Sequence, residues 1–89
     1  MSNLNISLKA KKYLEKLPSK QYKQVASRIF DLLTKKEHSD IKHLSGRPGY
    51  FRIDQGEYRI IFKIEDNIVY IPIVGKRNDD SVYRDFSRM

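Results

Sequence analysis

Three apolar-rich segments joined by two short turns constrain the fold most strongly. The segments are YFRID, EYRIIFKI and IVYIPIV, and the residues between them include Gln55-Gly56 and Asp66-Asn67. Apolar alternation of this kind is typical of strands, and connections this short force neighbouring strands to run antiparallel. The second half of the chain is therefore predicted to form a three-stranded meander.

Alternation in the middle segment divides its side chains between two faces. One face carries Tyr58, Ile60, Phe62 and Ile64, and the other carries Arg59, Ile61, Lys63 and Glu65. In the first segment, Tyr50, Arg52 and Asp54 share a face. The third segment is apolar on both faces, which predicts a central or well-covered strand, although Pro72 removes one donor from its ladder.

The first half of the chain has the periodicity of two helices. Leu4 and Ile6 can form an edge strand, and Ser7 can cap a first helix that ends at Pro18. Ser19 is placed to cap a second helix. The apolar positions are Ala10, Tyr13, Leu14 and Leu17 in the first helix, then Tyr22, Val25, Ala26, Ile29, Leu32 and Leu33 in the second. So short a turn predicts an antiparallel helical hairpin, which would cover the apolar face of the meander and leave Arg59 on the open face.

These elements predict one α+β domain over residues 1–89, with the helical hairpin packed on a small twisted, mainly antiparallel sheet. The segment HLSGRPGY is expected to be a loop, and a short C-terminal helix is expected from about Asp79. The chain has no cysteine, and two histidines cannot form a zinc site alone. No metal or cofactor is expected. Without a signal peptide or an apolar span, the protein is expected to be cytoplasmic, with no membrane partner.

The charge balance favours a polyanion as partner. Lys and Arg total 18 against 11 acidic residues, which gives a formal net charge of +7 and a pI near 9.7. Nucleic acid, an anionic membrane and an acidic protein all fit this charge. The many lysines of the two helices fit either a solvated helix face or long-range attraction for RNA.

Cationic side chains and a tyrosine are predicted to converge on the open face of the sheet. They are Arg52, Arg59, Lys76, Arg77 and Tyr83, the last three within the stretch VGKRNDDSVY. Guanidinium groups bind phosphate oxygens in a bidentate way, and tyrosine can stack on a base or exchange a proton. The set is a candidate RNA site. Its structural alternative is that Arg52 and Arg59 pair with nearby acidic residues and that Tyr83 packs in the core.

The order helical hairpin, KHLSG, EYRIIF and VGKRNDDSVY resembles the RelE toxin family of type II toxin–antitoxin systems over nearly the whole chain. The most specific parts are Tyr58-Arg59 and the segment from Val74 to Tyr83. The resemblance implies a microbial-ribonuclease-like fold and an endonuclease that cleaves mRNA in the ribosomal A site without metal, so inhibiting translation. It also implies an acidic, partly disordered RelB-like antitoxin as partner, beside mRNA and the ribosome.

The resemblance also implies roles for individual residues. Arg59 would bind the scissile phosphate, Arg77 would assist the leaving 5′-oxygen, and Tyr83 would position or help deprotonate the 2′-OH. Arg52 falls where the family has a basic residue on the first strand of the meander. Further substrate-binding residues are expected to be Lys76, Lys63 and His43. As an alternative, His43 is simply a solvent-facing loop residue, although an imidazole can serve as an acid or base near neutral pH.

Asp54 departs from the family pattern, which has a second lysine two residues after the first. Either Asp54 is a general base in a variant site, or it turns aside and activity is weaker; the second alternative is the one expected. Two other functions stay open. The chain could resemble the ParE branch, whose members share the fold but poison DNA gyrase, or it could be a catalytically weak relative that mainly binds the antitoxin.

Overall fold

The computed structural model describes residues 3–34 and 41–77, which form two helices and a five-stranded sheet. The helices are α1 (Leu8–Glu15) and α2 (Ser19–Leu33). The strands are β1 (Asn3–Ile6), β2 (Lys42–His43), β3 (Phe51–Gln55), β4 (Tyr58–Glu65) and β5 (Ile68–Lys76). The expected C-terminal helix and Tyr83 lie outside the described residues.

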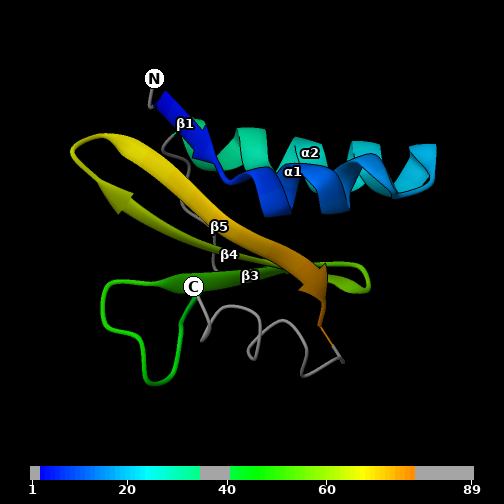
Figure 1. Cartoon of the computed structure of the whole chain (residues 1–89). Helices are drawn as coiled ribbons and strands as arrows, with labels where there is room; N and C mark the ends of the chain where they lie inside the picture. The colour runs from blue at the N-terminus through cyan, green and yellow to red at the C-terminus, as the bar shows by residue number, and fades with distance from the viewer. Residues whose placement is uncertain (1–2, 35–40, 78–89) are drawn as a thin grey trace.

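The sheet has the strand order β1-β5-β4-β3-β2 (Figure 1). The three strands β3, β4 and β5 form the predicted antiparallel meander, and the predicted edge strand is β1, which pairs parallel with β5. Asp66 and Asn67 both have positive φ, 51° and 64°, which suits a tight turn between twisted strands. The other turn lies at Gly56-Glu57, one residue later than expected.

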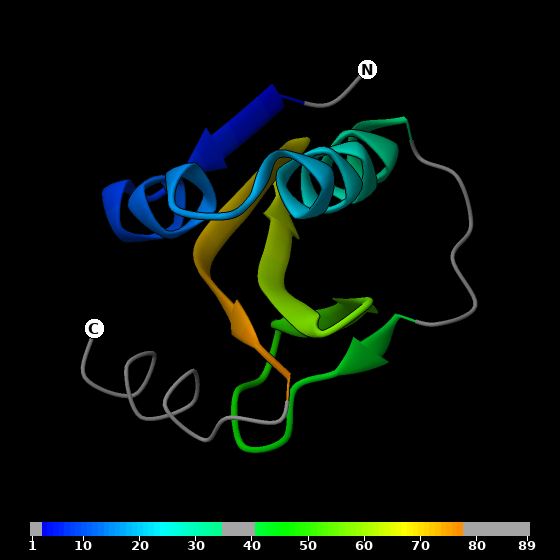
Figure 2. The same cartoon turned by 90° about the vertical axis from the view of Figure 1, so that its right-hand side faces the viewer.

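The two helices lie side by side on one face of the sheet and run antiparallel (Figures 1 and 2). Their apolar residues pack against the strands to form the main core. From the sheet this core takes Ile53, Tyr58, Ile60, Phe62, Val69, Ile71 and Val74, and from the helices Ala10, Leu14, Val25, Ile29, Leu32 and Leu33. The predicted α+β architecture is therefore confirmed for the described residues.

The first helix begins where its cap was predicted. The Ser7 hydroxyl accepts a hydrogen bond from the Ala10 amide at 3.0 Å and donates one to the Pro72 carbonyl at 2.7 Å. It therefore caps α1 and ties that helix to β5. The expectation for Ser19 was wrong, because Pro18 is the N-cap of α2 and no side chain caps this end.

An irregularity in β5 explains how a proline fits inside the sheet. The register between β4 and β5 shifts between Ile61 and Lys63, so that Ile71 and Pro72 together lie opposite Phe62. A bulge of this kind leaves one residue outside the regular ladder, where a missing N–H costs little.

The face of the sheet turned away from the helices, the open face, has a small apolar cluster of its own. Leu44, Ile61 and Ile73 are buried there, and Tyr50 packs against them. The segment between β2 and β3 makes this possible, because the Leu44 amide bonds to the Tyr50 carbonyl at 2.9 Å. Two positions of the expected loop HLSGRPGY differ from the prediction, since His43 belongs to β2 and Leu44 is buried. Neither helix that the structure describes is long and apolar enough to cross a membrane.

Candidate functional site

The strand register gathers three of the predicted cations on the open face. Asp54 lies opposite Arg59, and Arg59 lies opposite Gly75. Side chains directly opposite each other share a face. Arg77 follows Gly75 by two residues, and its amide bonds to the Glu57 carbonyl at 2.9 Å, which holds the end of β5 against the start of β4.

Arg59 and Asp54 form a bidentate ion pair at the centre of this group. Arg59 Nε donates to Asp54 Oδ1 at 2.8 Å, and Arg59 Nη2 donates to Asp54 Oδ2 at 3.3 Å. The Arg59 side chain is only 13% exposed and that of Asp54 31%. Because it is partly screened from water, the pair has a better-defined geometry than a typical surface ion pair.

The pKa of Asp54 reports the surrounding charge. The hydrogen bond from Arg59 lowers this pKa below its usual value, burial raises it by less than that bond lowers it, and the charges of Arg59, Arg52 and Arg77 lower it further. Three guanidinium groups thus act on one carboxylate. Asp54 does not turn aside from them, and as a strongly ionised group it is a weak base near neutral pH.

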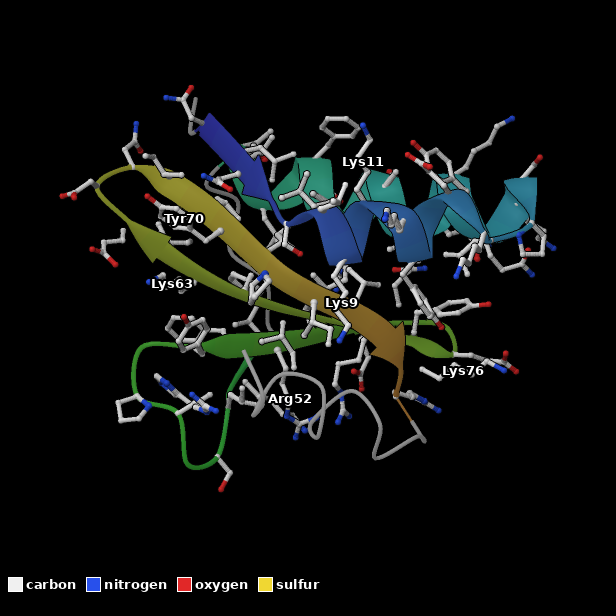
Figure 3. The ribbon with its side chains drawn as sticks, in the orientation of Figure 1. Lys9, Lys11, Arg52, Lys63, Tyr70 and Lys76 are labelled. Carbon is white, nitrogen blue, oxygen red and sulfur yellow. The ribbon has the colours of Figure 1, made fainter. Side chains whose placement is uncertain are left out.

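Two of the predicted substrate-binding residues do not join this group. Lys76 lies opposite Tyr58, a residue of the main core, so the strand directs Lys76 to the helix-covered face. Figure 3 shows Lys76 at the far end of β5 and Arg52 on the side of the sheet away from the helices. His43 lies opposite Phe51, with ring centroids 4.8 Å apart, and Phe51 packs against the main core. The expectation that Lys76 and His43 bind substrate beside the arginines therefore lacks support from the geometry.

Lys42 is a cation that the sequence argument missed. It lies opposite Arg52 in the pairing of β2 with β3, so it shares the open face with the arginines. The sequence did not reveal the face of Lys42, because a strand of two residues is too short to show alternation of apolar and polar residues. Only the pairing with β3 shows which face each residue lies on. Tyr83 lies outside the described residues, so its role stays a prediction.

Lys63 is on the open face as predicted, but at the other end of the sheet. Its ammonium group lies 5.4 Å from the ring centroid of Tyr50 and 5.2 Å from that of Tyr70. It also lies 3.3 Å from a carboxylate oxygen of Glu65, and the hydrogen bond to Glu65 raises the pKa of Lys63 above its usual value. Lys63 is therefore a cation held between two aromatic rings.

The fold and the charged face define a small α+β domain with an arginine-lined sheet, and comparison with known proteins places it in a family. The family model described as "ParE toxin of type II toxin-antitoxin system, parDE" matches residues 4–81. The chain belongs to this toxin family, within the RelE/ParE superfamily. No match was found among curated proteins.

Solved structures of RelE toxins have the same fold. The isolated Escherichia coli RelE toxin is 23% identical, with a TM-score of 0.75 over 99% of this chain and 97% of that chain. The E. coli RelBE toxin–antitoxin complex is 25% identical, with a TM-score of 0.73 over 85% and 96% of the two chains. The RelBE2 complex of Mycobacterium tuberculosis is 28% identical, with a TM-score of 0.70 over 85% and 98%. The resemblance to RelE toxins is thus confirmed at the level of fold and superfamily.

Proposed function

We propose that this toxin is a metal-independent mRNA endonuclease that cleaves RNA by attack of a 2′-OH on the adjacent phosphate. The observation that carries the proposal is the strand register, which places Arg52 and Arg59 on the open face with Arg77 just beyond the end of β5, beside a carboxylate that Arg59 binds. The guanidinium of Arg59 donates two hydrogen bonds to the two oxygens of Asp54, and a phosphate presents oxygens in a similar arrangement. The site is thus suited to hold a phosphate once Asp54 is displaced.

The cations have separate tasks in this reaction. The 2′-OH loses its proton and its oxygen attacks phosphorus, the bond to the 5′-oxygen breaks, and the 5′-oxygen takes up a proton, so that a 2′,3′-cyclic phosphate and a 5′-OH result. Arg59 exchanges Asp54 for the scissile phosphate and stabilises the negative charge of the transition state. Arg77 assists the leaving oxygen, Arg52 adds positive charge, and Tyr83 positions the 2′-OH or helps to remove its proton.

Partners follow from the small size and the charge of the domain. We assign the presentation of mRNA to the ribosome, which would place the reaction in the cytoplasm, and the formal charge of +7 favours docking on ribosomal RNA. RelE relatives have been solved in complex with RelB antitoxins. An acidic RelB-like antitoxin would silence this chain by covering the arginines.

Cleavage of mRNA on programmed ribosomes tests the proposal. Arg59→Ala and Arg77→Ala should each slow cleavage on the order of 10²-fold, because each removes a group that stabilises developing charge. Lys12→Ala is the matched control, since Lys12 is exposed on α1 and should leave the rate unchanged. Full cleavage by both arginine variants would contradict the site.

Asp54→Lys distinguishes two roles of this carboxylate, which either competes with the phosphate for Arg59 or acts as a general base. If the carboxylate competes with phosphate for Arg59, the variant should cleave faster than the wild type, whereas a general base would be lost and cleavage would slow. A wild type that leaves the 5′ ends of cellular mRNA unchanged after induction would instead identify a catalytically weak relative that mainly binds its antitoxin. The Arg59–Asp54 pair is the observation that keeps this alternative open.

Poisoning of DNA gyrase is the second candidate function. The match to a ParE family model favours it. Purified protein would then increase gyrase-dependent DNA breaks and leave ribosome-bound mRNA intact. The mRNA endonuclease is preferred because a protein-binding toxin has no need for three arginines near one half-buried anion position.

A further inference from the structure

A row of polar and aromatic side chains crosses the open face at a distance from the arginines. Asn5 lies opposite Tyr70, and Tyr70 lies opposite Lys63. Tyr50 precedes the first residue of β3 and reaches the same lysine, as its 5.4 Å separation from Lys63 Nζ shows. The row thus draws on β1, β5, β4 and the segment before β3, and Figure 3 shows Lys63 and Tyr70 at the end of the sheet opposite Lys76.

The side chains of this row line an open depression. Asn5, Tyr50, Lys63 and Tyr70 all contribute to it, and its volume is about 260 Å³. Both tyrosines are half-buried, and the Lys63 side chain is 31% exposed. The depression therefore presents ring surfaces, one ammonium group and one amide to a ligand.

These groups together have the chemistry of a single-stranded nucleic-acid site. Aromatic rings on a sheet stack bases, a lysine contacts phosphate, and an asparagine amide can bond to a base edge. A carboxylate-bearing peptide would use the lysine but would gain nothing specific from two ring surfaces. RNA is therefore the better fit.

The row is also within reach of the arginine cluster, which consists of Arg52, Arg59 and Arg77, because Lys63 and Arg59 lie on the same strand. Lys63 follows Arg59 by four residues, a separation of roughly 13 Å along β4. Between them lies the apolar cluster around Ile61, with no charge of its own. An extended RNA strand of a few nucleotides could contact both places.

We propose that Tyr50, Lys63 and Tyr70 form a second nucleotide subsite, which binds a base and a phosphate of the mRNA a few nucleotides from the scissile bond. This proposal rests on the proposed function. In the subsite, the base stacks on a tyrosine ring, most directly that of Tyr70, and Lys63 turns from Glu65 to the phosphate.

The test is the binding of a labelled RNA of about eight nucleotides, with 2′-O-methyl groups that prevent cleavage, measured by fluorescence anisotropy at several salt concentrations. Tyr70→Leu should weaken binding about 5- to 150-fold, because it removes a stacking ring. Tyr70→Phe keeps the ring and should bind like the wild type. Tyr22→Leu is the matched control, since Tyr22 is an exposed tyrosine of α2, outside the open face. Lys63→Gln should reduce the slope of log affinity against log salt by about 0.7.

The outcomes separate the subsite from the proposed function. The subsite is overturned and the proposed function is kept if the wild type cleaves mRNA on the ribosome and the variants all bind RNA as the wild type does. These variants are Tyr70→Leu, Tyr50→Leu and Lys63→Gln. If these variants lose RNA binding but the wild type does not cleave mRNA, the subsite is supported and the proposed function is overturned. A wild type that does not bind the RNA at low salt overturns the subsite. So does a polyglutamate peptide whose binding depends on Tyr70 as strongly as RNA binding does. Circular dichroism of each variant checks that it is folded.

Discussion

At the scale of single residues, Asp54 and Arg59 determine the character of the site. Their bidentate pair places a carboxylate where the family pattern has a lysine. The sequence predicted that the two residues lie on neighbouring strands, and it allowed the pairing. It could not show which of several acidic residues Arg59 binds, because that choice depends on register across the sheet.

The pair should make stability depend on pH. Because the pKa of Asp54 is lowered in the folded protein, ionised Asp54 stabilises the fold above its unfolded pKa of about 4. This contribution is lost as the pH falls through the lower, folded pKa. Urea unfolding should therefore show Asp54→Asn less stable than the wild type by roughly 1 kcal/mol at pH 7, with the difference vanishing at acid pH.

The control for this measurement is Asp66→Asn, which makes the same chemical change at an exposed turn position. Its effect should be small and nearly independent of pH, since asparagine also tolerates positive φ. A difference between Asp54→Asn and the wild type that stayed constant from pH 7 to acid pH would contradict the role of the ion pair.

Lys76 and Arg77 show which side-chain directions could have been predicted from the sequence alone. Lys76 and Arg77 are adjacent at the end of a strand, and consecutive strand residues point to opposite faces. The sequence itself therefore contained the reason why Lys76 leaves the site when Arg77 joins it. His43 is different, because only its pairing with Phe51 reveals its face.

At the scale of elements, the meander was predictable because alternation and turn residues agree locally. The structure differs from the prediction mainly where tertiary contacts determine the bounds of an element. The short β2 exists through its pairing with β3, and α2 begins at Ser19, after the N-cap residue Pro18, without a side-chain cap. The bulge in β5 also could not be located from Pro72 alone, since a proline fits equally at a strand edge.

Ser7 offers a test of how α1 is joined to the sheet. Ser7→Ala removes both the cap of α1 and the hydrogen bond to the Pro72 carbonyl, and we expect a loss of about 1–2 kcal/mol in the free energy of unfolding. Ser7→Asp can restore the cap but cannot donate to the carbonyl when ionised, so it should recover only part of the loss.

Ser27→Ala is the control, because Ser27 is exposed in the interior of α2 and alanine favours a helix. It should leave stability unchanged or raise it slightly. Equal urea midpoints for Ser7→Ala and the wild type would show that Ser7 does not connect α1 to β5 energetically.

At the scale of the whole molecule, the positive charge is spread over both layers, but the two layers should contribute differently to RNA binding. Arg59→Gln should lower the slope of log affinity against log salt by about 0.7 for single-stranded RNA, because one phosphate contact is lost. Lys12→Gln and Lys23→Gln, on the exposed sides of α1 and α2, should change the slope less.

Titrations of the uncleavable RNA from low to moderate salt measure these slopes. Equal changes for the helix lysines and for Arg59 would mean that RNA binds the molecule as a diffuse polycation. In that case neither the arginine cluster nor the open face would define the binding site.

Because of the bulge in β5, the face on which a residue of this strand lies depends on how many residues separate it from the bulge. Val69 and Ile71 face the helices before the bulge, and Val74 faces them after it, although the numbering changes from odd to even. Pro72 is the extra residue of the bulge, and it shifts the alternation of faces by one position along the strand. Loss of this residue alone would leave every neighbour on its own face, whereas a gap elsewhere in β5 that kept the bulge would exchange core and surface at one end. Sequence alignments of related toxins should therefore place a one-residue length difference in this strand at Pro72.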